Sequence, residues 1–262
     1  MFETILTEKK DGIAKIIINR PESSNAFASN TYFEIRDAVN EFNSDPEVRV
    51  IQITGAGKHF SAGGDIKAFK AKSKNTAPVE PEGLVKVSEM GTSIRLCKKP
   101  VIAVVNGAAM GAGCALVLAC DFRVMSPRTK LGMAFINMGL SGDNGGYYYL
   151  QKLIGTAKAT EMMAMGSVIT GEEAKELGLV TRYADSPETL QETADTFSKE
   201  LMKKAPLAFA KQKKLAYEFF YRDLPQYLQR EAQLNAECFN TQDHKEAVNA
   251  FLEKREPVFQ GK

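Results

Sequence analysis

The stretch KPVIAVVNGAAMGAGCALVLACDFRV, residues 99–124, carries the pattern that sets the fold of this chain. Residues 101–105 are a short apolar and β-branched run that predicts a strand, and residues 122–125 predict another. Between them, residues 111–120 are small and apolar throughout, which favours a helix that is buried on every side. A strand, a buried helix and a second strand in succession predict an α/β layer arrangement.

The same alternation continues toward the N-terminus, and it stops toward the C-terminus. Residues 5–19 alternate and then become apolar around Asp11-Gly12, which predicts a hairpin. The elements expected next are a helix capped by Asn30, a strand at residues 50–54, a polar and proline-rich loop at residues 72–83, and a helix at residues 85–97. After Gly142 the pattern is almost wholly helical. We therefore predict an α/β core over residues 1–200 and a helical C-terminal region over residues 201–262.

The composition is that of a globular protein and excludes several classes of function. The 262 residues include 34 Lys and Arg against 32 Asp and Glu, so the net charge of +2 favours neither nucleic acid nor a membrane surface as a partner. No apolar run approaches the roughly 20 residues of a membrane span, and the mixed, charged N-terminus predicts no signal peptide. We expect a cytoplasmic protein. The most basic stretch, from Lys203 to Lys214, is interpreted as a solvated helix face.

The cysteines and histidines predict neither a disulfide framework nor a metal site. Of the four cysteines, Cys114 and Cys120 lie inside the apolar stretch, which is typical of small buried side chains. Only two histidines, His59 and His244, are present, which disfavours a zinc enzyme or a histidine-based triad. We expect no metal ion and no redox cofactor.

Two glycine-rich turns share one design, because each follows a strand with small residues. The first turn is FSAGGD, residues 60–65, and the second is NGAAMGAG, residues 106–113, which leads into the buried helix. Small residues let a ligand approach the backbone, and a helix N-terminus offers unpaired N–H groups. If the turns converge, two N–H groups can stabilise the enolate of a carbonyl compound. The alternative is that each turn is a tight connection without a ligand.

These motifs resemble those of the crotonase, or enoyl-CoA hydratase/isomerase, superfamily. The resemblance includes NRPESSNAF (residues 19–27), the two glycine turns, GSVITGEEAKELGLV (residues 166–180) and FLEKREPVFQGK (residues 251–262). It therefore covers nearly the whole chain. It implies the crotonase (ClpP-like) spiral of ββα units, with a C-terminal helical region that forms a homotrimer or a dimer of trimers. It also implies an acyl-CoA thioester as ligand, with coenzyme A as part of the substrate rather than a separate cofactor.

The resemblance also implies a set of site residues. The two oxyanion-hole N–H donors would belong to Gly64 and Ala112. The adenine and pantetheine side would be lined by Ser61, Ala62, Asp65, Ile66 and Lys67. Gly111, in the second turn, would also bind the substrate. Phe251 and Lys254 would approach the coenzyme A of a neighbouring subunit.

The reaction depends on carboxylates, and the two expected in a hydratase of this family are missing. Their positions hold Ala115 and Phe135. What remains is Asp143, in a pattern similar to that of the 1,2-epoxyphenylacetyl-CoA isomerase branch. A carboxylate among apolar and glycine residues is desolvated, which raises its proton affinity, so it can move a proton along an acyl chain. We therefore predict a double-bond isomerase with Asp143 as acid and base. The alternative for Asp143 is the N-cap of a following helix.

Three other functions remain open at this stage. The chain could be an enoyl- or dienoyl-CoA hydratase that uses a non-standard carboxylate. It could be a hydrolase or dehalogenase with Asp143 as nucleophile, although the histidine base of that branch is replaced by Ser88, with Glu89 beside it. It could also be a non-catalytic acyl-CoA-binding protein. Phe135 and the tyrosines at 147–149 are candidates to line the acyl pocket, with packing as the alternative for the tyrosines.

Overall fold

The computed structural model describes residues 2–67 and 78–262, and a six-stranded sheet lies at its centre. The strands, in their order across the sheet, are β1 Ile5–Lys10, β2 Ile13–Ile18, β3 Val50–Gly55, β4 Val101–Val104, β6 Phe122–Met125 and β9 Arg182–Tyr183. β1 and β2 pair antiparallel around Asp11 and Gly12, which both have positive φ, and every other pair of neighbours is parallel. The predicted hairpin and the three predicted strands are therefore confirmed.

A second sheet of three short strands carries the glycine turns along its edge. The strands lie in the order β5 Ala108–Met110, β7 Lys130–Gly132 and β8 Val168–Thr170. Beyond β5, a single bridge joins Ser61 to Ala109, and Gly64 is bridged in turn to Phe27. The sequence does not predict these strands, because a run of three residues is too short to show an alternation.

Helices cover the sheets, and one of them is enclosed by the rest of the molecule. They are α1 Thr31–Ser44, α3 Pro81–Leu96, α4 Ala112–Ala119, α5 Gly146–Ile154, α6 Thr156–Met165, α7 Gly171–Glu176 and α8 Leu190–Met202, with 3-10 turns at Pro21–Ser23 and Ile136–Met138. Every residue of α4 is buried, as predicted, and α4 packs against α3 and α5. No helix within residues 2–67 and 78–262 is long and apolar enough to cross a membrane.

The order of these elements repeats. β1, β2 and α1 form one ββα unit, β4, β5 and α4 form another, and β6, β7 and α5 follow the same order with a 3-10 turn before the helix. The predicted α/β spiral of ββα units is confirmed. Its consequence for function is that each unit brings a turn between strand and helix to the same region of the molecule.

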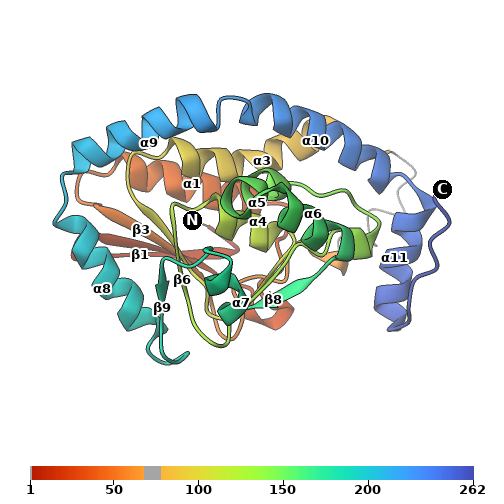
Figure 1. Cartoon of the computed structure of the whole chain (residues 1–262), viewed down its shortest axis with the longest axis horizontal. Coiled ribbons are helices and arrows are strands. Elements are labelled where there is room, and N and C mark those ends of the chain that lie inside the picture. Colours follow the sequence, from red (N-terminus) through yellow and green to blue (C-terminus); the bar gives the residue numbers. More distant parts are fainter. Residues whose placement is uncertain (1, 68–77) are drawn as a thin grey trace.

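The C-terminal region is helical, as predicted, and it folds back over the core. It consists of α9 Pro206–Phe220, α10 Leu224–Phe239 and α11 Gln242–Glu253. Figure 1 shows α9 and α10 as an arch above α1, α3 and α5, with α11 turning down beside the C-terminus. Both α9 and α10 contact α3. The division into residues 1–200 and 201–262 stays a prediction.

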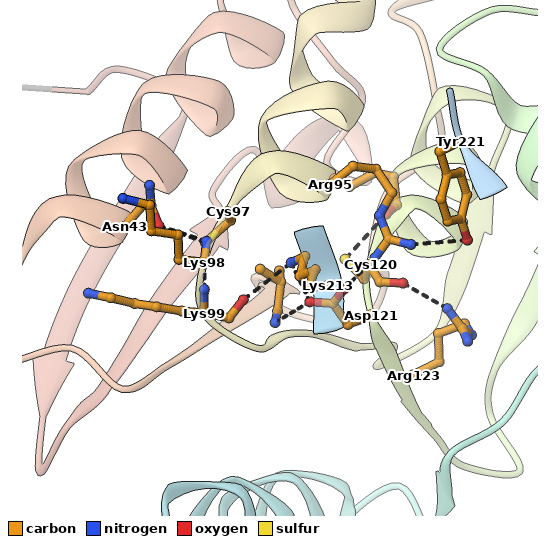
Figure 2. Close-up of polar contacts among 12 residues, drawn as sticks. Asn43, Arg95, Cys97, Lys98, Lys99, Cys120, Asp121, Arg123, Lys213 and Tyr221 are labelled. Atoms are coloured by element: carbon orange, nitrogen blue, oxygen red, sulfur yellow. Dashed lines mark hydrogen bonds and ion pairs between the residues drawn. The ribbon is translucent and has the colours of Figure 1, made fainter. Parts of the chain in front are cut away.

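A buried cluster of charges joins α9 to the core. Lys213 of α9 donates a 2.6 Å bond to Asp121, which also pairs with Arg95 of α3. Figure 2 shows Asp121 between the two cations, with Arg95 also bonded to Tyr221 at the end of α9. Lys213 is only 9% exposed, so the interpretation of the whole basic stretch as a solvated face is wrong at this residue. A charge count along a helix does not reveal which lysine meets a buried carboxylate.

Two local expectations near the helix ends are also wrong. Residues 81–83, expected in a loop, are the first turn of α3, because Pro81 stands at the helix start, where its missing N–H costs nothing. Residues 78–80 lie in neither a helix nor a strand, as expected, and residues 72–77 lie outside the described residues. Asn30 precedes α1 but its side chain makes no cap bond, since its amide donates to Glu3 and Glu34 instead.

Candidate active site

The first glycine turn is held by hydrogen bonds among its own residues. The Ser61 hydroxyl donates to the carbonyl of Asn25 at 2.8 Å and accepts from the N–H of Gly63 at 3.1 Å. Gly63 has a φ of +88°, and a Cβ at this position would lie 2.7 Å from the carbonyl oxygen of Met110. Glycine is required here, because a side chain would be strained and would push the two turns apart.

The second turn ends at the N-terminus of α4 and lies directly against the first. Gly111 adopts φ 49° and ψ −121°, which directs the chain into the helix. A Cβ at Gly113 would lie 2.7 Å from the Cβ of Ser61. Such contacts are possible only between two backbones in close approach, so the two turns do converge.

Two backbone N–H groups remain free where the turns meet. Ala112 is the first residue of α4, so its N–H has no carbonyl partner within the helix. Phe27 pairs with the residues on either side of Gly64, through bonds of 2.7 Å to Gly63 and 3.2 Å from Asp65, so the N–H of Gly64 points away from Phe27. Within the described part of the chain, neither N–H donates a hydrogen bond.

Asn25 is a supporting residue to which the sequence analysis assigns no role. It is fully buried, and its amide nitrogen donates to the carbonyls of Ala56 and His59 at 2.8 and 2.7 Å. Its side-chain oxygen accepts from the N–H of Arg20 at 2.9 Å. One side chain thus joins the NRPESSNAF segment to the loop before the first turn. The only sign of this role in the sequence is the resemblance of that segment to a family motif.

Asp143 lies in the turn before α5 and does not cap that helix. The N-cap of α5 is Gly145, which has no side chain with which to cap the helix. Instead, Oδ1 of Asp143 accepts a 2.7 Å bond from the side chain of Asn144. The interpretation of Asp143 as a helix cap is therefore wrong.

Burial sets the proton affinity of Asp143. Desolvation by the surrounding protein raises the pKa of its carboxyl to about 6, against the opposing effect of the bond from Asn144. The residue is half-buried, so a reactant can still approach it. At neutral pH the carboxyl is ionised and is a stronger base than an exposed aspartate.

The ring of Phe135 connects the second turn to Asp143. Cβ atoms built on Gly111 and on Gly142 would come to 3.6 and 3.7 Å from this ring. Phe135 is only 7% exposed. Gly142, the residue before Asp143, and Gly111, the residue before Ala112, therefore lie against one aromatic side chain.

Tyr32 of α1 connects the first turn to Asp143. Its ring packs edge-on against Phe27, with the centroids 5.1 Å apart, and Phe27 is bridged to Gly64. Burial and then the negative charge of Asp143 raise the pKa of the Tyr32 hydroxyl well above its usual value. Asp143 is thus within electrostatic reach of a side chain that packs on Phe27, the residue bridged to the first turn. The sequence analysis missed Tyr32, because its position in a helical pattern does not reveal that it lies near Asp143.

The positions of the two missing glutamates are filled by packed apolar groups. A Cβ at Gly146 would lie 3.2 Å from the Cβ of Ala115 and 2.3 Å from the terminal methyl of Met133. Helix α5 therefore begins directly against α4, which leaves little space for a longer side chain at residue 115. The second position is the buried Phe135.

The residues expected on the coenzyme A side differ in exposure. Ala62 and Lys67 are exposed, and Asp65, Ile66 and Gly111 are half-buried. Asp65 forms an ion pair with Arg20 at 3.0 Å. Ser61 is fully buried and its hydroxyl bonds to Asn25 and Gly63, so its place on the coenzyme A side stays a prediction.

The remaining candidates lie outside this group. Phe251 is 57% exposed on α11, and Lys254 follows at the end of that helix. Their predicted contact with a neighbouring subunit stays a prediction. Glu89, considered as a substitute base, is half-exposed and pairs with Arg36 at 2.6 Å.

The tyrosines at 147–149 follow the packing interpretation. The hydroxyl of Tyr148 donates to Asp223 at 2.6 Å, which directs this side chain to the C-terminal helices. Tyr149 is buried beside Gly91, and the hydroxyl of Tyr147 bonds to Thr160 at 2.7 Å. Of the aromatic candidates for the acyl pocket, Phe135 alone is shown here in contact with the turns.

Comparisons with known proteins agree over the whole chain. The sequence model described as enoyl-CoA hydratase/isomerase matches residues 8–262. The chain is 36% identical over 260 residues to a crotonyl-CoA hydratase of Syntrophomonas wolfei, with 98% of each chain covered. It is 31% identical over 265 residues to a trans-2-decenoyl-[acyl-carrier-protein] isomerase of Streptococcus mutans, with 100% and 99% covered. The crystal structure of an enoyl-CoA hydratase from Mycobacterium avium subsp. paratuberculosis superimposes with a TM-score of 0.89 at 29% identity, covering 98% and 99% of the two chains.

Proposed function

The chain belongs to the enoyl-CoA hydratase/isomerase family, and on that premise we propose that it shifts a double bond in an acyl-CoA thioester, with Asp143 as acid and base. The observation that carries the proposal is a half-buried carboxylate of raised proton affinity that directly follows Gly142, which lies against the same Phe135 ring as Gly111 of the second glycine turn. One carboxylate suffices to take a proton from one carbon and return it to another.

The thioester carbonyl is proposed to bind where the turns meet. Its oxygen accepts from the N–H groups of Gly64 and Ala112, which have no other acceptor within the described part of the chain. A donor of this kind typically contributes about 3 kcal/mol to the stability of an oxyanion. The adenine and pantetheine groups extend along Ala62, Asp65, Ile66, Lys67 and Gly111. In a homotrimer or a dimer of trimers, Phe251 and Lys254 of a neighbouring subunit complete this surface.

The proposed reaction begins with a 3-enoyl thioester. Asp143 removes a proton from C2, and the negative charge moves onto the thioester oxygen as an enolate. The enolate then reforms the carbonyl while the double bond moves from C3–C4 to C2–C3. Asp143 returns its proton to C4, so that no atom is gained or lost.

The pKa of Asp143 predicts the pH dependence of this reaction. The base acts as the carboxylate, and burial raises the pKa of that carboxyl to about 6. We therefore expect kcat/KM to level off near pH 7 and to fall about tenfold per pH unit well below pH 6. Measurement of kcat/KM from pH 4.5 to 7.5 checks this prediction, and a profile that stays flat across pH 6 would contradict it.

A matched pair of substrates tests the reaction itself. We expect the enzyme to interconvert a 3-enoyl-CoA and the corresponding 2-enoyl-CoA, read by chromatography of the two isomers. A 3-hydroxyacyl-CoA as the main product would instead indicate hydration, and free coenzyme A would indicate hydrolysis.

Hydration is the second candidate function, because relatives at 36% and 33% identity are named as hydratases. A hydratase with this site would have to activate water without a carboxylate at residues 115 and 135. The dehalogenase alternative is disfavoured, since the half-exposed Glu89 is paired with Arg36 and no histidine takes the place of Ser88.

A further inference from the structure

Glu231 of α10 is a buried carboxyl group for which the proposed reaction has no role so far. It is 9% exposed, and its Oε2 accepts a 2.8 Å bond from the backbone N–H of Gly145. The Tyr227 hydroxyl, one helical turn earlier, lowers the pKa of the same carboxyl group. This contact joins the C-terminal region to the turn that carries Asp143.

The turn that receives this bond is conformationally unusual. Asn144 and Gly145 both have positive φ, at 55° and 69°. The N–H of Gly146 donates to the carbonyl of Asp143 at 3.1 Å, which closes the turn. Asparagine and glycine are the residue types that adopt this conformation most readily. Glu231 adds a bond to this turn from a helix 86 residues further along the chain.

Three titratable groups, each on a different part of the chain, surround Glu231. Tyr227 lies on its own helix, Tyr149 lies on α5, and Asp143 lies in the turn before α5. Burial, followed by the negative charge of Asp143, raises the pKa of Glu231 to about 8, and the bond from Gly145 opposes this. Burial raises the pKa of both tyrosines, so they are neutral. At neutral pH Glu231 therefore keeps its proton while Asp143 loses its own.

We propose that Glu231 is a positioning residue for Asp143. From its place on α10, Glu231 holds the turn that carries Asp143 and leaves Asp143 as the single negative charge beside the enolate. This inference rests on the proposed role of Asp143 as base. When Glu231 ionises at higher pH, a second negative charge stands near Asp143 and disfavours the further negative charge of the enolate. The wild-type rate should therefore fall above about pH 8 as well as below about pH 6.

Two variants separate the bond from the charge. Glu231→Gln keeps an oxygen that accepts from Gly145 but cannot ionise, so we expect kcat at pH 7 within about threefold of wild type and no fall above pH 8. Glu231→Ala has no acceptor, so we expect kcat to fall roughly tenfold or more at every pH, with little change in KM. Glu237→Gln, an exposed residue on the same helix, is the matched control and should behave as wild type.

A carboxyl titration followed by ¹³C NMR tests the coupling without turnover. We expect Asp143→Asn to lower the pKa of Glu231, because the charge that raises it is gone. A rate fall above pH 8 that persists in Glu231→Gln, or a Glu231 pKa that does not move in Asp143→Asn, would overturn the inference.

The inference and the proposed function fail in different ways. If Asp143→Asn is inactive while Glu231→Ala keeps its full kcat, the inference is wrong and the proposed function stands. If Asp143→Asn keeps full activity, the proposed base is wrong and the role of Glu231 falls with it.

Discussion

The Asp143→Asn variant is expected to bind acyl-CoA as the wild type does while its kcat falls by about 10²–10⁴-fold. Asparagine has nearly the same size as aspartate, and its oxygen can still accept the 2.7 Å bond from Asn144, so the turn before α5 is preserved. What is lost is the group that takes the proton. Because the N–H groups of Gly64 and Ala112 are untouched, KM should change little.

Steady-state kinetics on the purified variant, with a thermal melt to confirm folding, provide the measurement. The matched control is Asp185→Asn, which changes an exposed aspartate and should leave kcat unchanged. A kcat for Asp143→Asn equal to that of wild type would show that another group moves the proton.

The Asp121→Asn variant is expected to lose about 3–5 kcal/mol of unfolding free energy, because it leaves two largely buried cations without their carboxylate. The side chains of Arg95 and Lys213 are 10% and 7% exposed, and both pair with Asp121 (Figure 2). Asparagine keeps an acceptor for the N–H of Val101, which bonds to Asp121 at 2.9 Å, so the loss reports the charge rather than the fold of this loop.

Urea unfolding at pH 7 measures this loss. The control is Glu218→Gln, which breaks an ion pair with Lys214. The side chains of Glu218 and Lys214 are 50% and 67% exposed, so the urea midpoint should change little. Adding Lys213→Met to Asp121→Asn should restore part of the stability, because one unpaired cation is removed. A midpoint for Asp121→Asn equal to that of wild type would show that the cluster does not hold α9 to the core.

The fold and the two turns could be predicted because their signals are local. The hairpin at Asp11-Gly12, the buried helix α4 and the small residues of both turns each depend on a few consecutive residues. The expected position of Asp143 came from the family pattern around it. Asp143 does not cap α5 because Gly145, in a left-handed conformation, occupies the N-cap position.

The parts that sequence analysis missed are contacts between distant segments. Glu231 meets Gly145 across 86 residues, and Lys213 meets Asp121 across 92. Neither residue stands out in its helix, because a buried and an exposed charge look alike in a sequence. The bond from the Ser61 hydroxyl to the carbonyl of Asn25 is another such contact, because only the folded chain places these two residues side by side.

The most direct test of the account is turnover of a 3-enoyl-CoA in deuterated water, read by mass spectrometry at early times with wild type and Asp143→Asn in parallel. The account predicts that the wild type forms the 2-enoyl-CoA with no more than one deuterium gained per turnover, and that the variant forms almost none. A product that has gained the elements of D₂O, or an isomerisation that proceeds equally fast in the variant, would contradict it.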